Sequence, residues 1–269
     1  MTALTLSQHS TSRFALDMSP FIPQQLAGLN IDQISRLPLQ HGSDKAELGD
    51  FYTVGGSAAE RLVIENQDNR LLRVGQGMSQ GELQVEGDAG DEAGFRLNGG
   101  SLRINGNCGD HAGRAMRGGV LQIDGNCGMH LGGPAAGERQ GMRGGLIRVG
   151  GDAGDRAGER QRRGMILIHG DCGDYCALDM IAGSLCVAGQ AGAHSGHGMR
   201  RGSLVLQNAP ASMPTTFQKN GPYDAVFLRL LHKELQRLAF IAQDAPLPPV
   251  ERYLGDIACN GQGEILMLG

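Results

Sequence analysis

The sequence predicts an all-β protein, a right-handed parallel β-helix of coils about 19 residues long. Three observations predict it: a glycine recurs at a fixed interval, an alternating apolar stretch follows each glycine, and each interval is too short to place a helix between strands. We expect a non-repetitive N-terminal segment at 1–48, the parallel β-helix at 49–208, and a C-terminal amphipathic helix and tail at 209–269.

The repeat runs from Gly81 to Leu206. Successive intervals between its leading glycines are 19, 19, 26, 19, 19 and 19 residues, so one unit carries a seven-residue insertion. A constant period over seven units indicates stacked coils. The leading glycines are Gly81, Gly100, Gly119, Gly145, Gly164, Gly183 and Gly202.

Within each unit, the second and fourth residues after the leading glycine are aliphatic, as in Leu83 and Val85. This alternation indicates a strand with one buried face, and equivalent strands would pair in parallel about 4.8 Å apart. Further glycines six and nine residues after the first indicate tight corners, and a small Ala or Cys lies between them. The spacings of six, three, four and six residues do not form a strict hexapeptide repeat, which favours the right-handed type over the left-handed one.

The first 48 residues do not repeat. Residues 4–6 and 14–16 alternate as short strands would, and Asp32 is a plausible N-cap of a brief helix that ends at Pro38. Segments 61–64 and 71–74 resemble incomplete early repeats, as expected for an end coil with only one neighbour.

After Leu206 the pattern stops, and residues from Pro222 to about Ile241 predict an amphipathic helix with Pro222 in its first turn. We expect this helix to pack along the flank or over an end of the coils and to protect a sheet edge. Segment 263–268 would return as a last strand. The expected apolar face of the helix comprises Val226, Phe227, Leu230, Leu231, Leu235 and Leu238.

Composition and hydropathy argue against several classes of protein. The formal net charge of −4 gives no reason to expect a nucleic-acid partner. The N-terminus lacks the basic and apolar regions of a signal peptide, and no apolar run approaches the ~18 residues of a membrane span. The six cysteines form no CxxC pair, so we expect a cytoplasmic protein with reduced thiols and no membrane partner.

Several segments carry a resemblance to a known family. The glycine spacing resembles the GXGXG-type domain at the C-terminal end of glutamate synthase large subunits. Four segments look like the C subunit of formylmethanofuran dehydrogenase: 21–23 (Phe-Ile-Pro), 34–39 (Ile-Ser-Arg-Leu-Pro-Leu), 48–56 (Leu-Gly-Asp-Phe-Tyr-Thr-Val-Gly-Gly) and 173–183 (Gly-Asp-Tyr-Cys-Ala-Leu-Asp-Met-Ile-Ala-Gly). The tail segments 252–256 and 263–266 look like the bacterial version of that family, the C subunit of the formyltransferase/hydrolase complex.

The resemblance implies a non-catalytic structural subunit of a cytoplasmic hetero-oligomer in methylotrophic one-carbon metabolism. Such a complex moves a formyl group between tetrahydromethanopterin and a methanofuran-type carrier and releases formate, with its metal in other subunits. The resemblance transfers no catalytic, cofactor-binding or metal residue to this chain, so we expect the chain to bind no cofactor and to lack an active site of its own.

Two alternatives remain open. The chain could be the C subunit of a molybdenum- or tungsten-dependent formylmethanofuran dehydrogenase, whose complex contains a metal pterin and iron–sulfur clusters. It could instead be a stand-alone β-helical enzyme acting on polysaccharide. The second alternative requires a carboxylate cluster beside aromatic stacking platforms, and the regular coils contain only Phe95 and Tyr175.

One column of arginines is the candidate contact site. Seventeen residues after the leading glycine, allowing for the insertion, arginine recurs on three successive units, where stacked guanidinium groups would repel one another. The column could be solvated and offset by carboxylates elsewhere. It could also bind an acidic partner subunit or a polyglutamate-bearing cofactor tail, because arginine binds carboxylates bidentately. The candidate residues are Arg117, Arg143, Arg162, Arg163, Arg200 and Arg201.

Three other columns have structural interpretations. The residues seven after the leading glycine (Asp88, Asn107, Asn126, Asp152, Asp171 and Gln190) are expected to bond nearby backbone at a corner. Cys108, Cys127 and Cys172 share the small inward column, and the first two should lie close enough to bridge but stay reduced. His111, His130 and His194 share another column, where the intervening Arg156 and Tyr175 add no metal ligand, so no metal site is expected.

Overall fold

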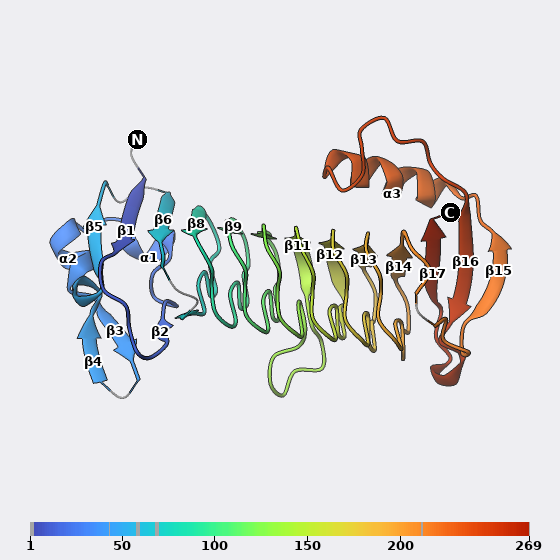
Figure 1. Ribbon diagram of the computed structural model, residues 1–269, viewed down its shortest axis with the longest axis horizontal. Helices are drawn as coiled ribbons and strands as arrows, with labels where there is room; N and C mark the ends of the chain where they lie inside the picture. The colour runs from blue at the N-terminus through green and yellow to red at the C-terminus, as the bar shows by residue number, and fades with distance from the viewer. Residues whose placement is uncertain (1–2, 43, 58–59, 68–69, 211, 269) are drawn as a thin grey trace.

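The computed structural model describes residues 3–42, 44–57, 60–67, 70–210 and 212–268, and it is an elongated stack of coils with a different segment at each end (Figure 1). In this part of the chain, thirteen strands form one mixed sheet along the whole length. In spatial order they are β15 (Gln218–Pro222), β16 (Val250–Gly255), β17 (Gly263–Leu268), β14 (Ser203–Leu206), β13 (Ser184–Val187), β12 (Arg163–Ile168), β11 (Arg143–Val149), β10 (Val120–Ile123), β9 (Ser101–Ile104), β8 (Glu82–Glu86), β6 (Arg61–Glu65), β1 (Leu4–Gln8) and β5 (Tyr52–Gly55).

The smaller elements gather at the two ends. A second sheet consists, in spatial order, of β4 (Asp44–Glu47), β3 (Pro38–His41), β2 (Leu16–Asp17) and β7 (Leu71–Leu72). The helices are α1 (Pro23–Leu26), α2 (Ile31–Ser35) and α3 (Val226–Arg237), with 3₁₀ turns η1 (Leu48–Asp50) and η2 (Ile257–Cys259). No helix among the described residues could cross a bilayer.

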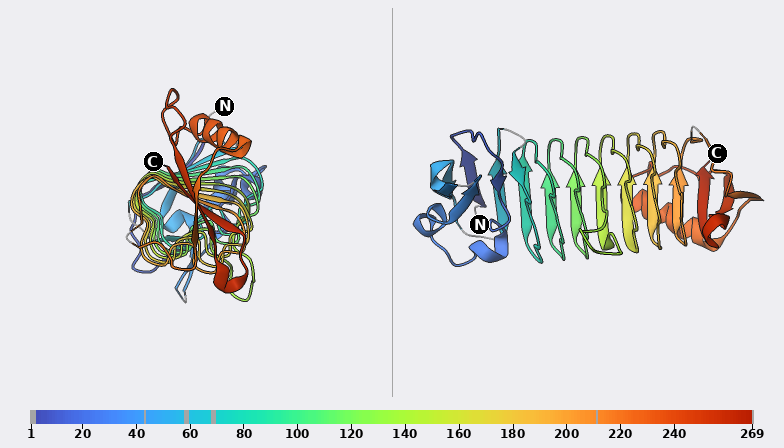
Figure 2. Two further views of the ribbon diagram at one scale, coloured as in Figure 1. Left: turned by 90° about the vertical axis from the view of Figure 1, so that its right-hand side faces the viewer. Right: turned by 90° about the horizontal axis from the view of Figure 1, so that it is seen from below.

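A strand follows each leading glycine, as the period predicts, and β11 and β12 begin one or two residues before theirs. Strands β6, β8 to β14 and β17 pair in parallel, with equivalent residues opposite each other, for example Leu102 with Leu121. A second ladder of isolated parallel bridges connects the small residues at the next corner. Viewed along the long axis, the coils superimpose, which places each repeat position in a column (Figure 2). The bridged residues are Ala89, Cys108, Cys127, Ala153, Cys172 and Ala191.

The leading glycines are required by backbone proximity as well as by conformation. Gly145 has φ 90°, a conformation that L-residues rarely adopt. A Cβ added to it would lie 2.7 Å from the carbonyl oxygen of Gly119, one coil earlier. Each coil therefore turns onto its strand at a point where only a hydrogen fits, which explains the strict recurrence of glycine.

The 26-residue interval is a loop that leaves the stack intact. The backbone N–H of Gly132 donates to Ala112 O at 2.8 Å before the loop, and that of Arg143 donates to Met116 O at 2.7 Å after it. Residues 133–141 therefore protrude from one corner (Figure 1), β10 and β11 pair in regular register after them, and one irregularity lies between Arg143 and Leu146 where β11 pairs with β12. We call these residues the insertion loop.

The N-terminal segment closes one end of the stack. Strand β1 lies between β6 and β5, so the segment before the repeats extends the main sheet. Helix α2 is capped by Asn30, whose side chain accepts from the Gln33 backbone in a capping box. The predicted N-cap, Asp32, is therefore wrong and lies in the first turn, because the asparagine two residues earlier satisfies the exposed N–H groups. Segment 71–72 pairs with β2 in the second sheet and does not begin a separate coil.

The C-terminal segment returns to the sheet through β17, which pairs in parallel with β14 as expected. The predicted helix start was wrong: Pro222 ends β15, whose antiparallel pairing with β16 takes up residues 218–222, and α3 begins at Val226. Strands from all three proposed domains share the main sheet, and the domain boundaries stay a prediction.

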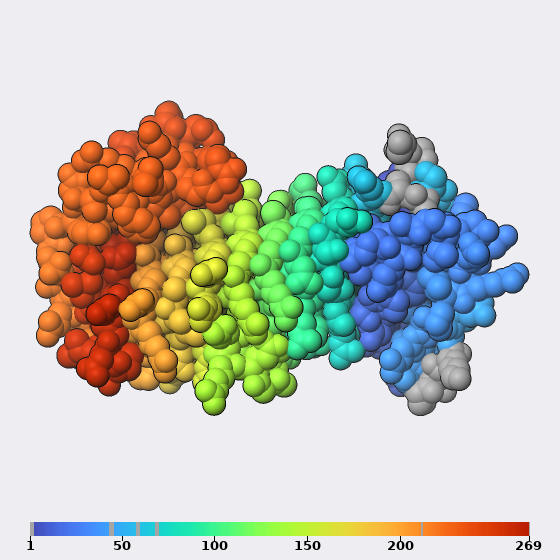
Figure 3. Space-filling model, turned by 180° about the vertical axis from the view of Figure 1, so that it is seen from behind, coloured from blue at the N-terminus to red at the C-terminus, as the bar shows by residue number. Residues whose placement is uncertain are grey.

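Helix α3 covers one flank of the C-terminal coils (Figures 1 and 3). Its buried residues pack on outward-facing apolar side chains of the sheet. The expected apolar face was partly wrong, since Val226, Phe227 and Leu230 are 69%, 41% and 63% exposed. The helix residues buried against the sheet are Leu228, Leu231, Leu235 and Leu238, and the sheet residues beneath them are Leu167, Cys186, Val205 and Leu266.

Candidate functional site

The structure places the predicted arginines at one corner of successive coils. The backbone N–H of Arg117 donates to Leu97 O, that of Arg143 to Met116 O, and that of Arg162 to Met142 O, each at 2.7–2.8 Å. These bonds connect equivalent positions of neighbouring coils. Ile181 and Arg200 continue the same column through their own bonds to the preceding coil.

The expected stack of repelling guanidinium groups is interrupted by a carboxylate from the insertion loop. Glu138 accepts from Arg143 and also from Arg96, the latter at 2.8 Å. The side chain of Glu138 is only 20% exposed, so this pairing is shielded from water. Arg143 is therefore neutralised within the chain and differs from the other candidates.

The remaining five candidate arginines have no ion pair among the residues that the structure describes. Four of them gather at one place: Arg162, Arg163, Arg200 and Arg201 surround Ile181. Arg117 lies on an earlier coil and lines neither of the depressions at this corner.

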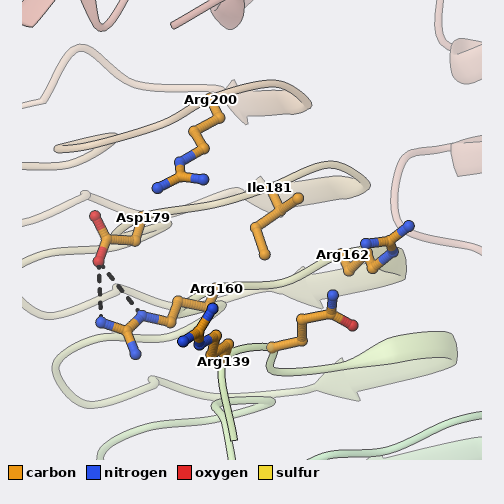
Figure 4. A pocket seen from close by; sticks show the side chains of 7 residues that line it. Arg139, Arg160, Arg162, Asp179, Ile181 and Arg200 are labelled. Atoms are coloured by element: carbon orange, nitrogen blue, oxygen red, sulfur yellow. Dashed lines mark hydrogen bonds and ion pairs between the residues drawn. The ribbon is translucent and has the colours of Figure 1, made fainter. Parts of the chain in front are cut away.

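Two adjoining depressions of about 550 Å³ each lie between these arginines. Both are lined by Arg162, Ile181 and Arg200. The first also receives Arg139 and Gln140 from the insertion loop, as well as Arg160 and Asp179 (Figure 4). The nitrogen of Arg160 lies 3.4 Å from the Asp179 carboxylate, the only carboxylate that lines either depression among the described residues.

The sequence did not identify Arg139 or Arg160 as part of this site. Arg139 belongs to the insertion, whose path is not set by the 19-residue period. Arg160 lies two positions before the predicted column, and a signal for it was available, because Arg96 and Asp179 occupy the same repeat position on other coils.

The polar column seven residues after the leading glycine bonds backbone, as predicted. From Asp88 to Asp171, each side-chain oxygen accepts from the backbone N–H of the equivalent residue one coil later, for example Asp152 Oδ1 from Asp171 N–H at 2.8 Å. Five such bonds of 2.7–2.9 Å run along the stack. A second, unpredicted column repeats this geometry through Asp91, Asp110, Asp155 and Asp174.

The inward thiols are core residues. Cys108 and Cys127 bridge adjacent coils through backbone pairing, and all six cysteines are free. Burial raises the pKa of the Cys127 thiol to about 12 and also raises that of Cys108. Such thiols stay protonated at neutral pH and are poor nucleophiles.

The histidine column forms stacked pairs. The rings of His111 and His130 stack with centroids 5.0 Å apart, and His130 Nδ1 lies 3.0 Å from Glu159. Burial, together with nearby Arg114, lowers the pKa of His111. Within the described ranges, no group of three or more His, Cys, Asp or Glu side chains is placed to hold a metal ion.

Comparison with known proteins then tests the resemblance. No protein-family model matches the sequence. A 93-residue match is 32% identical to the C subunit of the tungsten-containing formylmethanofuran dehydrogenase 2 of Methanothermobacter thermautotrophicus, covering 33% of this chain and 34% of that relative. A 75-residue match is 37% identical to the C subunit of the formyltransferase/hydrolase complex Fhc of Methylorubrum extorquens and covers 28% of each. The matched segments thus span about a third of these curated relatives.

A solved structure extends the likeness to the whole chain. A chain of the formyltransferase/hydrolase complex (FhcABCD) from Methylorubrum extorquens, solved in complex with methylofuran, matches with a TM-score of 0.91 and 35% identity. The match covers 98% of this chain and 99% of that chain. The chain belongs to the family of formylmethanofuran dehydrogenase C subunits. These likenesses confirm the predicted family, whereas the likeness to glutamate synthase stays a prediction.

Proposed function

We propose that this chain is the structural C subunit of a formyltransferase/hydrolase complex and has no active site of its own. The observation that carries the proposal is the end-to-end likeness to a chain of FhcABCD at 35% identity. In this assignment the complex transfers a formyl group between tetrahydromethanopterin and a methanofuran-type carrier. Other subunits hold the metal, and this chain binds no cofactor.

The polar columns support a structural role. The carboxylates and amides seven residues after the leading glycine hold the next coil, and the inward cysteines fill a core. These are the groups that would otherwise be candidates for acid–base or nucleophilic chemistry. The full-length likeness to a subunit of a hetero-oligomer leaves the stand-alone polysaccharide-acting enzyme without support.

We also infer that the stacked coils wind as a right-handed parallel β-helix. The parallel ladders on two sides of the stack support this inference. Connections between parallel strands of one sheet are right-handed in about 98% of cases, which supports the handedness. The free cysteines support a cytoplasmic location, where thiols stay reduced.

The second candidate is the C subunit of a tungsten- or molybdenum-dependent formylmethanofuran dehydrogenase, because curated relatives bear that name. Purification of the native complex through an affinity tag on this chain distinguishes the candidates. We expect three further polypeptides and formyl transfer without molybdenum, tungsten or iron–sulfur clusters. These metals in the complex would favour the dehydrogenase, and recovery of the chain alone as an active monomer would refute both candidates.

A further inference from the structure

The charged groups at one corner of the stack divide at the insertion loop. On the N-terminal side, Arg96 pairs with Glu138 and Arg114 with Glu92, both at 2.8 Å, and Arg117 is the one candidate arginine there without an ion pair among the described residues. On the C-terminal side, most guanidinium groups have no ion-pair partner among the described residues. We call this unpaired set the arginine surface. It comprises Arg139, Arg162, Arg163, Arg200 and Arg201.

The arginine surface has a shape that admits an extended chain. Its two depressions adjoin through Ile181, so a continuous hollow crosses several coils. Figure 4 shows the guanidinium groups of Arg139, Arg160 and Arg200 on one side of Ile181 and that of Arg162 on the other. A ligand lying over Ile181 would thus meet guanidinium groups on both sides.

The chemistry of the surface favours a run of carboxylates. Guanidinium groups bind carboxylates through two parallel hydrogen bonds, and equivalent positions on successive coils lie about 4.8 Å apart. A small-molecule site encloses most of its ligand, whereas these depressions are partly open to solvent. The chain as a whole carries a net charge of −4, so its overall field does not attract a large polyanion such as nucleic acid.

The insertion loop shows that this corner accepts carboxylates. Glu138 pairs with both Arg96 and Arg143, which are far apart in sequence. The guanidinium groups on the other side of the loop present the same chemistry without such an occupant. Glu138 therefore supplies the carboxylate that Arg96 and Arg143 bind. The arginine surface has no such carboxylate among the described residues, so a carboxylate that binds there would come from another molecule.

We propose that the arginine surface binds an acidic segment of another subunit, which lies along the stack from the insertion loop toward β14. This inference rests on the proposed function, because it takes its partner from the same complex. It goes beyond that function by naming the surface and the chemistry of the segment that docks on it.

Cross-linking in the intact complex identifies the occupant. Ile181 is replaced by p-benzoylphenylalanine in the tagged chain, the complex is purified, and the cross-linked peptide is sequenced after irradiation. We expect a peptide rich in Asp and Glu from another polypeptide of the complex. A link to a polyglutamate cofactor tail, a link to nucleic acid, or no link would overturn the proposal. If no other polypeptide is recovered even with the tagged natural chain, the proposed function itself fails.

A charge-matched pair of variants then tests affinity. The first carries Arg162→Gln and Arg200→Gln, and the control carries Arg103→Gln and Arg148→Gln on the outer face of the sheet, with the same loss of charge. Binding of a fluorescent deca-glutamate peptide to each purified, folded chain is measured by anisotropy at about 0.1 M salt. We expect at least about a tenfold loss of affinity in the first variant and less than about twofold in the control. Equal affinities would overturn the proposal.

Discussion

Two polar columns run along the same stack of coils, and their side chains differ in the partners that they bind. The column of Asp and Asn seven residues after the leading glycine bonds the backbone of the next coil at every step from Asp88 to Gln190. The arginine column ten residues further on has one carboxylate partner, on Arg143, and the other arginines have none in the part of the chain that the structure describes. Both columns follow the same repeat in the sequence, although Ile181 interrupts the arginines.

The difference teaches what regularity in a repeat means. A short side chain beside a tight corner reaches the next coil about 4.8 Å away and satisfies a backbone donor there. A long arginine at an exposed corner extends away from the stack and needs a carboxylate, which comes from the next coil for Arg160 and from the insertion loop for Arg143. The repeat in both columns therefore indicates only that the coils stack. Whether a side chain stabilises the fold or is available for contact depends on its hydrogen-bond or ion-pair partner.

The largest expected effect comes from disturbing the Asp and Asn column through its backbone. A Cβ added at Gly170 would overlap the Asp152 carboxylate and the Gly151 backbone. We expect Gly170→Val to lower the free energy of unfolding by about 3 kcal/mol, because this corner cannot expand without separating two coils. Thermal unfolding measures the effect. Gly55→Val is the control, since nothing lies within 4 Å of a Cβ added there, and equal melting of both variants would contradict the tight corner.

A second pair of variants separates the two columns directly. Asp152→Ala removes the acceptor of the Asp171 N–H, and we expect a loss of about 1 kcal/mol in stability with unchanged binding of the deca-glutamate peptide. Arg162→Gln should change stability by less than about 0.5 kcal/mol and weaken peptide binding. The same result for stability and binding in both variants would remove the distinction between a fold column and a contact column.

Much of the fold could be predicted from the sequence because glycine spacing fixes the coils. Each leading glycine located a strand, and the columns followed from the period. The short N-terminal elements were predicted less completely: segment 4–6 falls in β1, segment 14–16 overlaps the two-residue β2 only at Leu16, and the four-residue α1 was not predicted. Their positions depend on packing against the end coil, which no local pattern encodes.

Helix α3 carries two adjacent apolar stripes, and for this reason its buried face could not be predicted correctly from the sequence. Val226 and Leu230 form one stripe, and Leu228, Leu231 and Leu235 form another beside it. The second stripe packs against the sheet and is buried there. A signal for the docking place was present: the outward third position after the leading glycine changes from polar in the early coils to Leu167, Cys186 and Val205 in the later ones.

The candidate site could be predicted only in part. The period brought Arg162 and Arg200 together, but it could not reveal that Glu138 pairs with Arg143. That pairing depends on the path of the insertion loop, and the second partner of Glu138, Arg96, lies 42 residues earlier. Ion pairs between such distant residues follow from the stacking of coils rather than from sequence proximity.

The insertion loop offers a smaller test of the comparison. Glu138→Gln would leave Arg96 and Arg143 without their carboxylate and extend the unpaired region toward the N-terminal coils. We expect a loss of about 0.5 kcal/mol in stability and about twofold tighter binding of the deca-glutamate peptide. Arg139→Gln, next to it in the loop, should instead weaken binding. Unchanged affinity in Glu138→Gln would show that its carboxylate does not limit the surface.

A further effect concerns pH and the ion pairs of Glu92, on the N-terminal side of the insertion loop. Burial alone would raise the pKa of Glu92, but hydrogen bonds from Arg73 and Arg114 outweigh it and hold the pKa below its ordinary value of 4.5. The folded state therefore favours the ionised carboxylate more than the unfolded state does. The resulting stability, less than about 1 kcal/mol, is present above 4.5 and is lost as the pH falls through the lowered pKa.

Melting temperatures of the natural chain and Glu92→Gln across this range provide the measurement. The natural chain should melt higher at neutral pH, and the gap should narrow as the pH falls below 4.5. Glu82→Gln is the matched control, because Glu82 is exposed and 3.9 Å from Arg61, and it should show little gap at any pH. A gap for Glu92 that stayed constant into acid would mean that its two arginines do not stabilise the charged carboxylate. The ion pairs of Glu92 would then no longer distinguish Arg73 and Arg114 from the unpaired arginines of the arginine surface.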